Sequence, residues 1–235
     1  NKSSKKFHEN MHELPEKWGK GNITNFDYLL MLNYFSTRTF NDVNQYPIFP
    51  WLSLMNDEGL LNRDFRYPIT CQNKTSKENA LNHYNSTLSE VDGFQNHFGT
   101  HYSTSSYIFF YLVRVIPHLF HIINLQNNAL DNPNRMFSRF LETQKIIKQG
   151  LDNRELIPEL FCSVDFLLNL NYAFLGRRTD KKIINDFCCS FEGSQDVSNV
   201  VKIIIWHRNA LESTDVRNNI EKWIDWVFGA NQLPN

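Results

Sequence analysis

NFDYLLMLNYFSTRTFNDVNQYPIFPW, residues 25–51, begins as an amphipathic helix and ends as an irregular loop of unusual composition. That loop contains three aromatic residues and two prolines: Tyr46, Phe49, Trp51, Pro47 and Pro50. Because a solvated loop has no need of so much apolar surface, we expect it to pack inside the core. Buried N–H and C=O groups then need hydrogen-bond partners. Four polar side chains of the same loop are placed to supply some of them: Asn41, Asp42, Asn44 and Gln45.

Chain length and charge limit the possible folds and the possible classes of binding partner. At 235 residues the chain can bury a sizeable core, and without an internal repeat or a domain-scale linker it is expected to form one domain. A formal net charge of −1 does not favour binding to the negatively charged backbone of a nucleic acid. The same charge argues against attraction to anionic lipid, so we expect membrane association to be indirect. No apolar run reaches the roughly 18 residues that span a bilayer, and the polar N-terminus predicts no signal peptide.

Hydrophobic periodicity and capping residues predict a mainly α fold. Thr24 is expected to be the N-cap of a helix that runs to about Ser36. Residues 103–116 are apolar nearly all round, which is typical of a buried central helix, here closed by Pro117. Arg114 then lies on a buried element and needs a carboxylate or carbonyl partner.

The other segments carry capping and breaking signals. Asn132 and Pro133 are expected to begin a helix that ends near Gly150 as its C-cap. Pro158 is expected to break or kink the first of two short helices, over residues 153–161 and 163–170. Over residues 53–96 we expect loops, one short helix and a mobile stretch at 72–80. A strand is expected at 182–187. Helices are expected at 197–211 and 216–228, the second with Gly229 as its C-cap.

Four histidines fall close together: His97, His101, His118 and His121. On a helix, the spacing of His97 and His101 could hold zinc, which makes a metal-dependent hydrolase an alternative function. Gly99 weakens a helix between them, and no acidic ligand cluster accompanies the four, so we expect them to satisfy buried backbone groups. The chain also lacks phosphate-loop and nucleophile-elbow motifs. We therefore predict no enzymatic activity, no metal and no cofactor.

Two carboxylate pairs are interpreted as structural. Glu155 and Glu159 lie four residues apart, and Glu212 and Asp215 flank a helix junction. We expect them to cap helices and to pair with nearby arginines: Arg154, Arg208 and Arg217. The cysteines match no zinc spacing and are interpreted as free thiols: Cys71, Cys162, Cys188 and Cys189. The aromatic stripe near the end is interpreted as core, with one interface anchor as the alternative: Trp206, Trp223, Trp226 and Phe228.

The order of short motifs along residues 18–232 resembles the BEACH domain family. In the first half, the matching residues are Trp18, Asn25, Phe26, Tyr28, Gln45, Tyr46, Pro47, Pro50, Trp51, His97, Gly99, His101, Tyr102, Arg114 and Pro117. In the second half, they are Gln126, Asp131, Pro133, Arg135, Glu155, Pro158, Glu159, Glu212, Ser213, Trp223, Asp225 and Gly229. So many ordered motifs identify residues 18–232 as a BEACH-type domain, preceded by a linker or leading helix at 1–17 and followed by a tail at 233–235.

Some positions depart from the family pattern. FCCSF stands at residues 187–191 where an LPPWA element is expected, and Asn127 and Asn128 replace paired glycines. Gln144 stands where a tryptophan is expected. These departures put the packing around residues 185–192, and any partner that docks there, in question.

The resemblance implies a mostly helical domain around core segments that lack regular secondary structure, in agreement with the buried-loop argument. It implies two protein partners in the same chain, an adjacent PH-like domain and a WD-repeat domain. It further implies a non-catalytic scaffold role in cytoplasmic proteins, peripheral to endomembranes, that act in vesicle trafficking, lysosome-related organelles or autophagy. Direct lipid binding is a second alternative, against which the neutral charge argues.

Overall fold

The computed structural model describes residues 2–56, 59–86, 95–149, 152–188 and 197–229. Its α-helices are α1 (Lys2–Gly19), α2 (Asn25–Phe35), α3 (Lys74–Ser86), α4 (Ser105–Tyr111), α5 (His118–Leu125), α6 (Phe140–Lys148), α7 (Val197–Leu211) and α8 (Thr214–Val227). The 3-10 helices are η1 (Ile69–Cys71), η3 (Pro133–Arg135), η4 (Pro158–Phe161) and η5 (Asp165–Leu167). The short strands are β1 (Ser53–Asn56), β2 (Gly59–Asn62), β3 (Thr100–His101) and β4 (Asp152–Asn153). The predicted mainly α, single-domain fold is confirmed.

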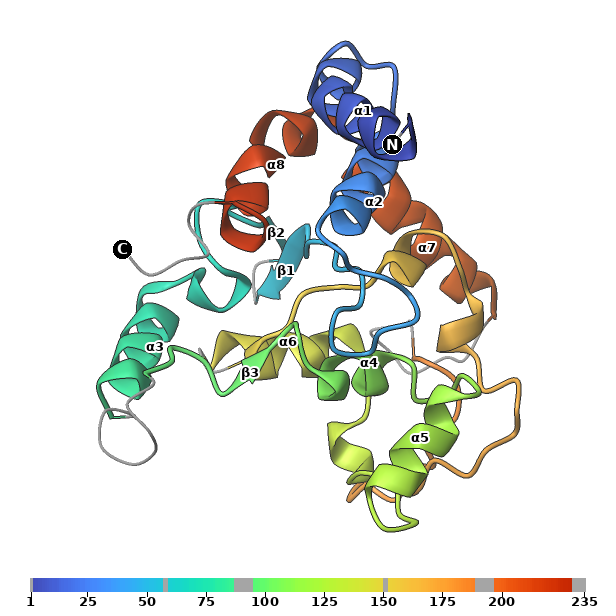
Figure 1. Ribbon diagram of the computed structural model, residues 1–235. Helices are drawn as coiled ribbons and strands as arrows, with labels where there is room; N and C mark the ends of the chain where they lie inside the picture. Colours follow the sequence, from blue (N-terminus) through green and yellow to red (C-terminus); the bar gives the residue numbers. More distant parts are fainter. Residues whose placement is uncertain (1, 57–58, 87–94, 150–151, 189–196, 230–235) are drawn as a thin grey trace.

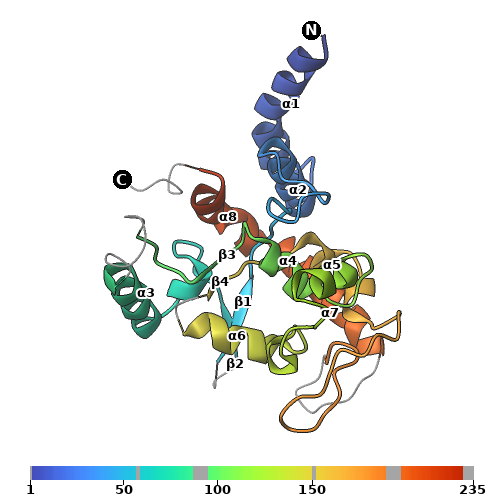
Figure 2. The same cartoon turned by 60° about the horizontal axis from the view of Figure 1, so that its bottom comes forward.

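The helices surround a small amount of strand. In Figure 1, α1, α2 and α8 lie in the upper part of the molecule and α4, α5 and α6 in the lower part, with the antiparallel β1–β2 hairpin between them. Figure 2 shows α1 extending away from the rest of the chain. The parallel pair of β3 and β4 joins Thr100 to Asp152, so the HFGTHYS element lies beside the segment that leads into ELIPELF.

Local signals placed α2 and α8 correctly. The Thr24 hydroxyl accepts the Asp27 N–H at 3.0 Å and begins α2. The Ser213 hydroxyl accepts the Val216 N–H at 3.3 Å and begins α8. The C-cap of α8 is Phe228, and Gly229, which follows it, does not adopt the left-handed conformation. Instead, Gly229 lies so close to the last turn that an added Cβ would stand 2.8 Å from the Asp225 Cα.

The predicted central helix over residues 103–116 is too long. Only α4 forms, and Tyr107, Ile108 and Tyr111 on it are buried as expected. Beyond it, the Arg114 carbonyl accepts the Asn171 amide at 3.0 Å instead of an intrahelical N–H. Tertiary contacts have overridden helix propensity there.

The predicted helix over residues 132–150 divides in two. Asn132 caps only η3, by accepting the Asn134 N–H at 3.0 Å. The chain then runs extended at Met136 and Arg139 before α6 begins, and the expected cap at Gly150 lies outside the described residues. The extended stretch buries Phe137 completely, which a surface helix would not do.

Three further predictions need correction. The only helical elements within residues 153–161 and 163–170 are the 3-10 turns η4 and η5, and Pro158 begins η4 rather than breaking a helix. Residues 182–187 form no strand; their ladder contact is an isolated bridge between Arg177 and Ile183. Over residues 53–96, where loops, one short helix and a mobile stretch at 72–80 were expected, the described part contains the β1–β2 pair and the 13-residue helix α3, which covers most of 72–80.

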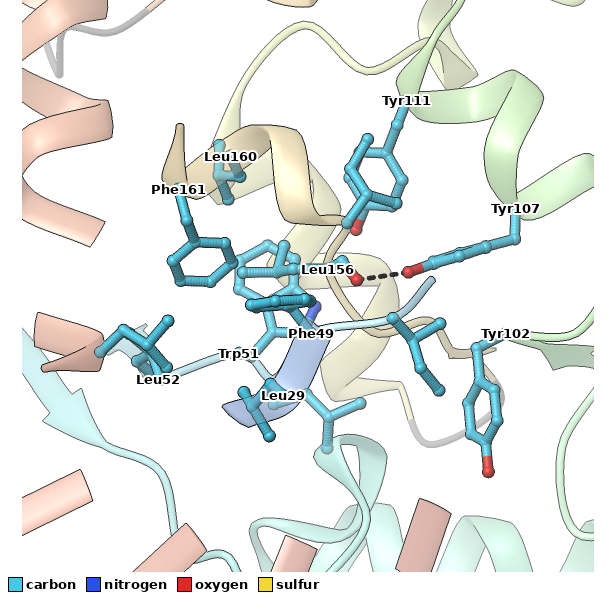
Figure 3. Packing of buried hydrophobic residues seen from close by; sticks show 14 of the residues in the cluster. Leu29, Phe49, Trp51, Leu52, Tyr102, Tyr107, Tyr111, Leu156, Leu160 and Phe161 are labelled. Atoms are coloured by element: carbon cyan, nitrogen blue, oxygen red, sulfur yellow. Dashed lines mark hydrogen bonds between the residues drawn. The ribbon is translucent and has the colours of Figure 1, made fainter. Parts of the chain in front are cut away.

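The core is built from aromatic and aliphatic side chains that all parts of the chain contribute. Phe49 packs against Phe26 and Phe161 with ring centroids 5.1 and 5.2 Å apart. Figure 3 shows Phe49 among Leu29, Trp51, Leu156, Leu160 and Phe161, with Tyr107 and Tyr111 reaching in from α4. A smaller cluster holds α5 against the segment that follows η5: Val113, Leu119, Ile122, Met136, Leu175 and Ile184.

Candidate interaction site

The loop that ends the opening stretch is buried, as its composition predicted. Every residue from 46 to 54 is buried. Phe49 and Leu156 exchange both backbone hydrogen bonds at 2.8 Å, in an isolated antiparallel bridge. The Tyr107 hydroxyl donates to the second lone pair of the Leu156 carbonyl (Figure 3). The QYPIFPW and ELIPELF elements are therefore two halves of one buried structure.

The polar partners of this loop differ from those expected. Asn33 on α2 accepts the Ile48 N–H at 2.8 Å and donates to the Ile48 carbonyl at 2.9 Å, and Arg38 donates to the Tyr46 carbonyl at 3.0 Å. The four residues predicted for this role are exposed and serve their own turn or α4: Asn41, Asp42, Asn44 and Gln45. Asn33 carried a usable signal, because a polar residue on the apolar face of a helix needs an internal partner.

A buried ion pair fixes the end of the same loop. Arg63 and Glu155 form a bidentate pair at 2.7 and 2.8 Å, with only 1% and 3% of their side chains exposed. Glu155 also accepts the Trp51 N–H at 3.1 Å, and Arg63 donates to the Trp51 carbonyl at 3.3 Å. The sequence identified Glu155 but missed Arg63. The expected pairing with Arg154 is wrong, since Arg154 pairs with Asp152 at 2.9 Å.

Tyr46 and Glu159 tie the loop to η4. The Tyr46 hydroxyl donates to a Glu159 carboxylate oxygen. Burial raises the pKa of Glu159, and the Tyr46 hydrogen bond opposes that rise. Burial, together with the nearby Glu159 charge, raises the pKa of Tyr46. The pair is a structural link, because both groups face each other inside the fold.

The two ends of the domain meet at the start of α2. Glu212, at the α7–α8 junction, accepts the N–H groups of Asn25 at 2.7 Å and Phe26 at 3.1 Å. It also pairs with Arg208 at 3.2 Å, as expected. The Asn25 side chain donates to the Leu211 carbonyl at 2.7 Å and accepts the Trp18 indole N–H at 2.7 Å. A negative side chain at a helix N-terminus complements the helix dipole.

Arg217 of α8 closes this junction. It donates to the carbonyls of Trp18 at 3.1 Å and Ile23 at 2.9 Å, and it lies over the Trp18 ring. Trp18 in turn stacks on Tyr28, with ring centroids 4.4 Å apart. Arg217 therefore pairs with carbonyls and an aromatic ring rather than with a carboxylate.

The prediction that the buried Arg114 needs a carboxylate or carbonyl partner is confirmed. Its guanidinium donates to the carbonyls of Asn185 at 2.7 Å and Phe137 at 2.8 Å. Burial lowers the pKa of Arg114 to about 10, so the group stays charged at neutral pH. This one side chain joins the segment after α4 to the extended stretch before α6 and to the segment after η5.

The other family-motif residues divide between core and surface. Those buried are Tyr28, Pro47, Pro50, Tyr102, Pro158 and Trp223. Those exposed are Gln45, His97, Gly99, His101, Pro117, Gln126, Arg135 and Asp225. Arg135 pairs with Asp131 at 2.6 Å, and Pro133 packs under Gly176. Of the tryptophan stripe, Trp223 is core as predicted, whereas Trp206 is 40% exposed.

The histidines do not converge on one point. His97 stacks on Tyr84 with ring centroids 4.2 Å apart, and the His101 Nδ1 accepts the Ser103 N–H at 3.0 Å. His118 and His121 lie on α5, where burial and the neighbouring His121 lower the pKa of His118. Within the described residues, no group of three or more His, Cys, Asp or Glu could hold a metal ion. Three cysteines are free thiols, and Cys189 lies outside the described part: Cys71, Cys162 and Cys188.

A cavity of about 270 Å³ lies between the segment after β2 and α8. Its lining residues are Arg63, Asp64, Phe65, Arg66, Asp215, Asn219 and Lys222. The Trp226 indole donates to the Arg66 carbonyl at 3.0 Å and holds the two walls together. Both signs of charge line this cavity, which suits a polar group of a partner. Sequence reasoning missed it, because its walls are 150 residues apart in the chain.

The comparisons with known proteins agree with this fold. The family model described as "Beige/BEACH domain" matches residues 16–235. The chain is 34% identical to BEACH domain-containing protein lvsD of Dictyostelium discoideum, over 92% of its own length and 7% of that relative. It is also 34% identical to Lysosomal-trafficking regulator of Drosophila melanogaster, over 93% of its length and 6% of that relative. Beige protein homolog 1 of Saccharomyces cerevisiae is 32% identical, over 94% of this chain and 10% of the relative. The chain therefore belongs to the Beige/BEACH domain family.

Proposed function

We propose that this chain is a non-catalytic protein-interaction domain of a larger scaffold protein that acts in vesicle trafficking, in lysosome-related organelles or in autophagy. The observation that carries the proposal is its family membership, together with a relative named for lysosomal trafficking. The chain spans 10% or less of the length of the three relatives named above. A module that makes up so small a share of a large protein suits a scaffold role.

The internal structure supports a binding role over a catalytic one. Backbone groups or arginines engage the polar motif residues at the end of the buried loop and at the start of α2. These residues are Asn25, Glu155 and Glu212. Side chains fixed in this way hold separate segments in register and are not free to exchange protons with a substrate. Their role is to keep the surface rigid, and a rigid surface loses less entropy when a partner binds.

The partners proposed are an adjacent PH-like domain and a WD-repeat domain in the same protein, with the whole located in the cytoplasm at the periphery of endomembranes. No helix in the described ranges is long and apolar enough to cross a bilayer. Partner-mediated attachment would bring the protein to its membrane. The cavity beside α8 is the proposed contact point for a partner, because charged side chains of both signs line it, among them Asp215, Lys222 and Arg66.

Affinity capture of the intact protein from its native cells, followed by mass spectrometry, tests the proposal. The variant Asp215→Lys/Lys222→Glu reverses the two charges that α8 contributes to the cavity lining and keeps the net charge. The matched control is Lys74→Glu/Glu78→Lys, which reverses an exposed pair on α3. We expect the wild type and the control to retain coat, small-GTPase or autophagy components, and the cavity variant to lose a subset of them.

Two results would contradict the proposal. A clean capture without membrane-traffic components would refute the assigned process. Turnover of a substrate by the purified protein, lost in a variant of one motif residue that still folds, would refute the non-catalytic role. Equal partner sets for the cavity variant and the α3 control would leave the scaffold role standing and remove the cavity as its contact point.

A further inference from the structure

We infer that the tip formed by residues 170–183 contacts the anionic surface of a membrane directly. This contact goes beyond the proposed function, in which partners alone bring the protein to membranes. Figure 2 shows the segment, in orange, projecting at the lower right of the molecule. It combines exposed apolar side chains with cations that form no ion pair within the described residues, on a projecting part of the chain.

The apolar side chains of this tip are exposed far beyond what a loop requires. Tyr172 is 94% exposed, Phe174 is 72% exposed and Leu170 is 58% exposed. Ile183, on the returning segment, is 53% exposed. Isolated exposed apolar residues are normal, but four within fourteen residues of the chain are more than an ordinary loop exposes and indicate a binding surface.

Hydrogen bonds between Asn169 and the tip fix the conformation that exposes Tyr172. The Asn169 side chain accepts the Ala173 N–H at 3.1 Å and donates to the Ala173 carbonyl at 2.8 Å, which closes the loop between them. Tyr172 has a φ of +52°, a left-handed conformation that is uncommon for a residue with a bulky side chain. Strain of this kind persists where the surrounding contacts impose it, and it is frequent at functional positions. Asn169 thus holds the Tyr172 ring out into solvent.

Three cations flank the apolar side chains. Arg177, Lys181 and Lys182 are all exposed, and none of them forms an ion pair with another residue in the ranges that the structure describes. The Arg177–Ile183 bridge brings the two sides of this turn together. Arg178, in contrast, is held by carboxylates and does not contribute. The net charge of −1 for the whole chain therefore conceals a local positive surface.

The shape favours a lipid surface over a peptide. Peptide recognition uses a groove or a free sheet edge that surrounds the ligand's side chains. A tyrosine with 94% of its surface exposed lies on a projection, and a projection fits the soft interface of a bilayer, where aromatic rings reside at the headgroup level. Lysine and arginine next to it complement anionic headgroups. A contact of this size is weak alone and suits a protein that partners also hold at the membrane.

Vesicle co-sedimentation of the purified chain tests the inference. The vesicles contain either phosphatidylcholine alone or about 30% phosphatidylserine, at low ionic strength. We expect sedimentation with the anionic vesicles only, and its loss as salt is raised. Lys181→Glu/Lys182→Glu should lower the partition coefficient by at least about 25-fold, because each cation near the surface contributes about fivefold. Tyr172→Ser/Phe174→Ser should lower it by about tenfold, because the two rings no longer enter the interface.

Matched controls carry the same chemical changes elsewhere. Lys74→Glu/Lys145→Glu makes the same change in net charge on α3 and α6, and Tyr34→Ser/Leu81→Ser removes two exposed apolar side chains from α2 and α3. Both controls should sediment as the wild type does, and thermal melts should show that all variants are folded. The inference is overturned if the wild type ignores anionic vesicles, if it binds neutral vesicles equally well, or if the tip variants match their controls. Binding of an acidic, leucine-containing peptide by the tip, without vesicle binding, would also overturn it and reassign the tip to peptide docking.

Discussion

Glu155 is the residue on which the buried loop depends most. It offsets the charge of Arg63 and accepts the Trp51 N–H inside the core. Replacing Glu155 with Gln keeps the shape but leaves the Arg63 guanidinium buried without a counter-charge. We expect a loss of about 3–5 kcal/mol in the free energy of unfolding. Urea denaturation followed by tryptophan fluorescence measures it.

The control for this prediction is Asp131→Asn, which breaks a surface pair with Arg135. Exposed pairs contribute little, so this variant should lose less than about 1 kcal/mol. Equal losses in the two variants would show that burial gives the Glu155 pair no special weight, and that water reaches Arg63 in the native state.

A second prediction at the residue scale concerns His207. Its Nδ1–H donates to the Ile203 carbonyl at 2.9 Å, and the ring packs against Phe140. Burial lowers the pKa of His207 to about 4, from an ordinary value of 6.5. The folded state therefore favours the neutral ring, and its stability is complete above pH 6.5. As the pH falls from 6.5 toward 4, the unfolded chain binds a proton before the folded chain does, so stability falls.

The His207 contribution to this loss is about 3 kcal/mol over that range. Denaturant unfolding at several pH values between 6.5 and 4 gives the slope. His207→Gln keeps an N–H donor and does not titrate, so its slope should be shallower than that of the wild type. Parallel pH profiles would mean that another group is responsible for the acid sensitivity.

Residue-scale reasoning from sequence identified the groups that needed partners better than the partners themselves. Arg114 was expected to bind a carboxylate or a carbonyl and binds two carbonyls, and Glu212 pairs with Arg208 as expected. Arg63 could not be recognised, because nothing within twenty residues of it distinguishes it from a surface arginine. Its partner, Glu155, is 92 residues away, and only the fold brings the two together.

At the scale of elements, local capping chemistry decided what the sequence could predict. The helix α2 begins at its expected cap, Thr24, because a cap acts within three residues, and α8 begins two residues before the expected start at 216. The helices α4 and α6 are shorter than their apolar patterns, because Arg114 and Phe137 take backbone groups into tertiary contacts. The β1–β2 hairpin was missed, and the one short helix expected over residues 53–96 was not located, since a polar, asparagine-rich segment has little periodicity.

The segment after η5 supplies a prediction at this scale. Gly176 has a φ of +96°, and an added Cβ would stand 2.5 Å from the Pro133 Cγ. Gly176→Ala should therefore lower the free energy of unfolding by about 2–4 kcal/mol, through the left-handed backbone and the clash with η3. Thermal melting measures the change.

Gly19 is the matched control, because it lies at the end of α1 with nothing within 4 Å of the added methyl. Gly19→Ala should be neutral or stabilise by up to about 1 kcal/mol. If Gly176→Ala has the same melting temperature as the wild type, the packing of η3 against this segment is looser than the structure indicates. The exposed tip that follows Asn169 would then lack a rigid support.

For the molecule as a whole, the decisive arrangement is the closure of its two ends. Arg217 on α8 binds the carbonyls of Trp18 and Ile23, while Glu212 caps α2. These contacts join residues almost 200 positions apart, so α8 helps to hold α1, together with the contacts that Trp18 makes with Asn25 and Tyr28 of α2. The core around Phe49 touches this junction through the Phe26 ring, 5.1 Å from the Phe49 ring, but Phe49 also has backbone partners of its own at Leu156.

Arg217→Lys separates these two levels of organisation. Lysine keeps the charge but cannot donate to both carbonyls from one planar group. We expect amide hydrogen exchange to accelerate along α1, while protection in α4 and at Phe49 stays at the wild-type level, because local opening does not require global unfolding. Loss of protection in both regions would show that closure of the ends holds the entire domain. Unchanged exchange in α1 would show that the contacts with α2 suffice to hold it, and that this side of the surface is fixed independently of α8.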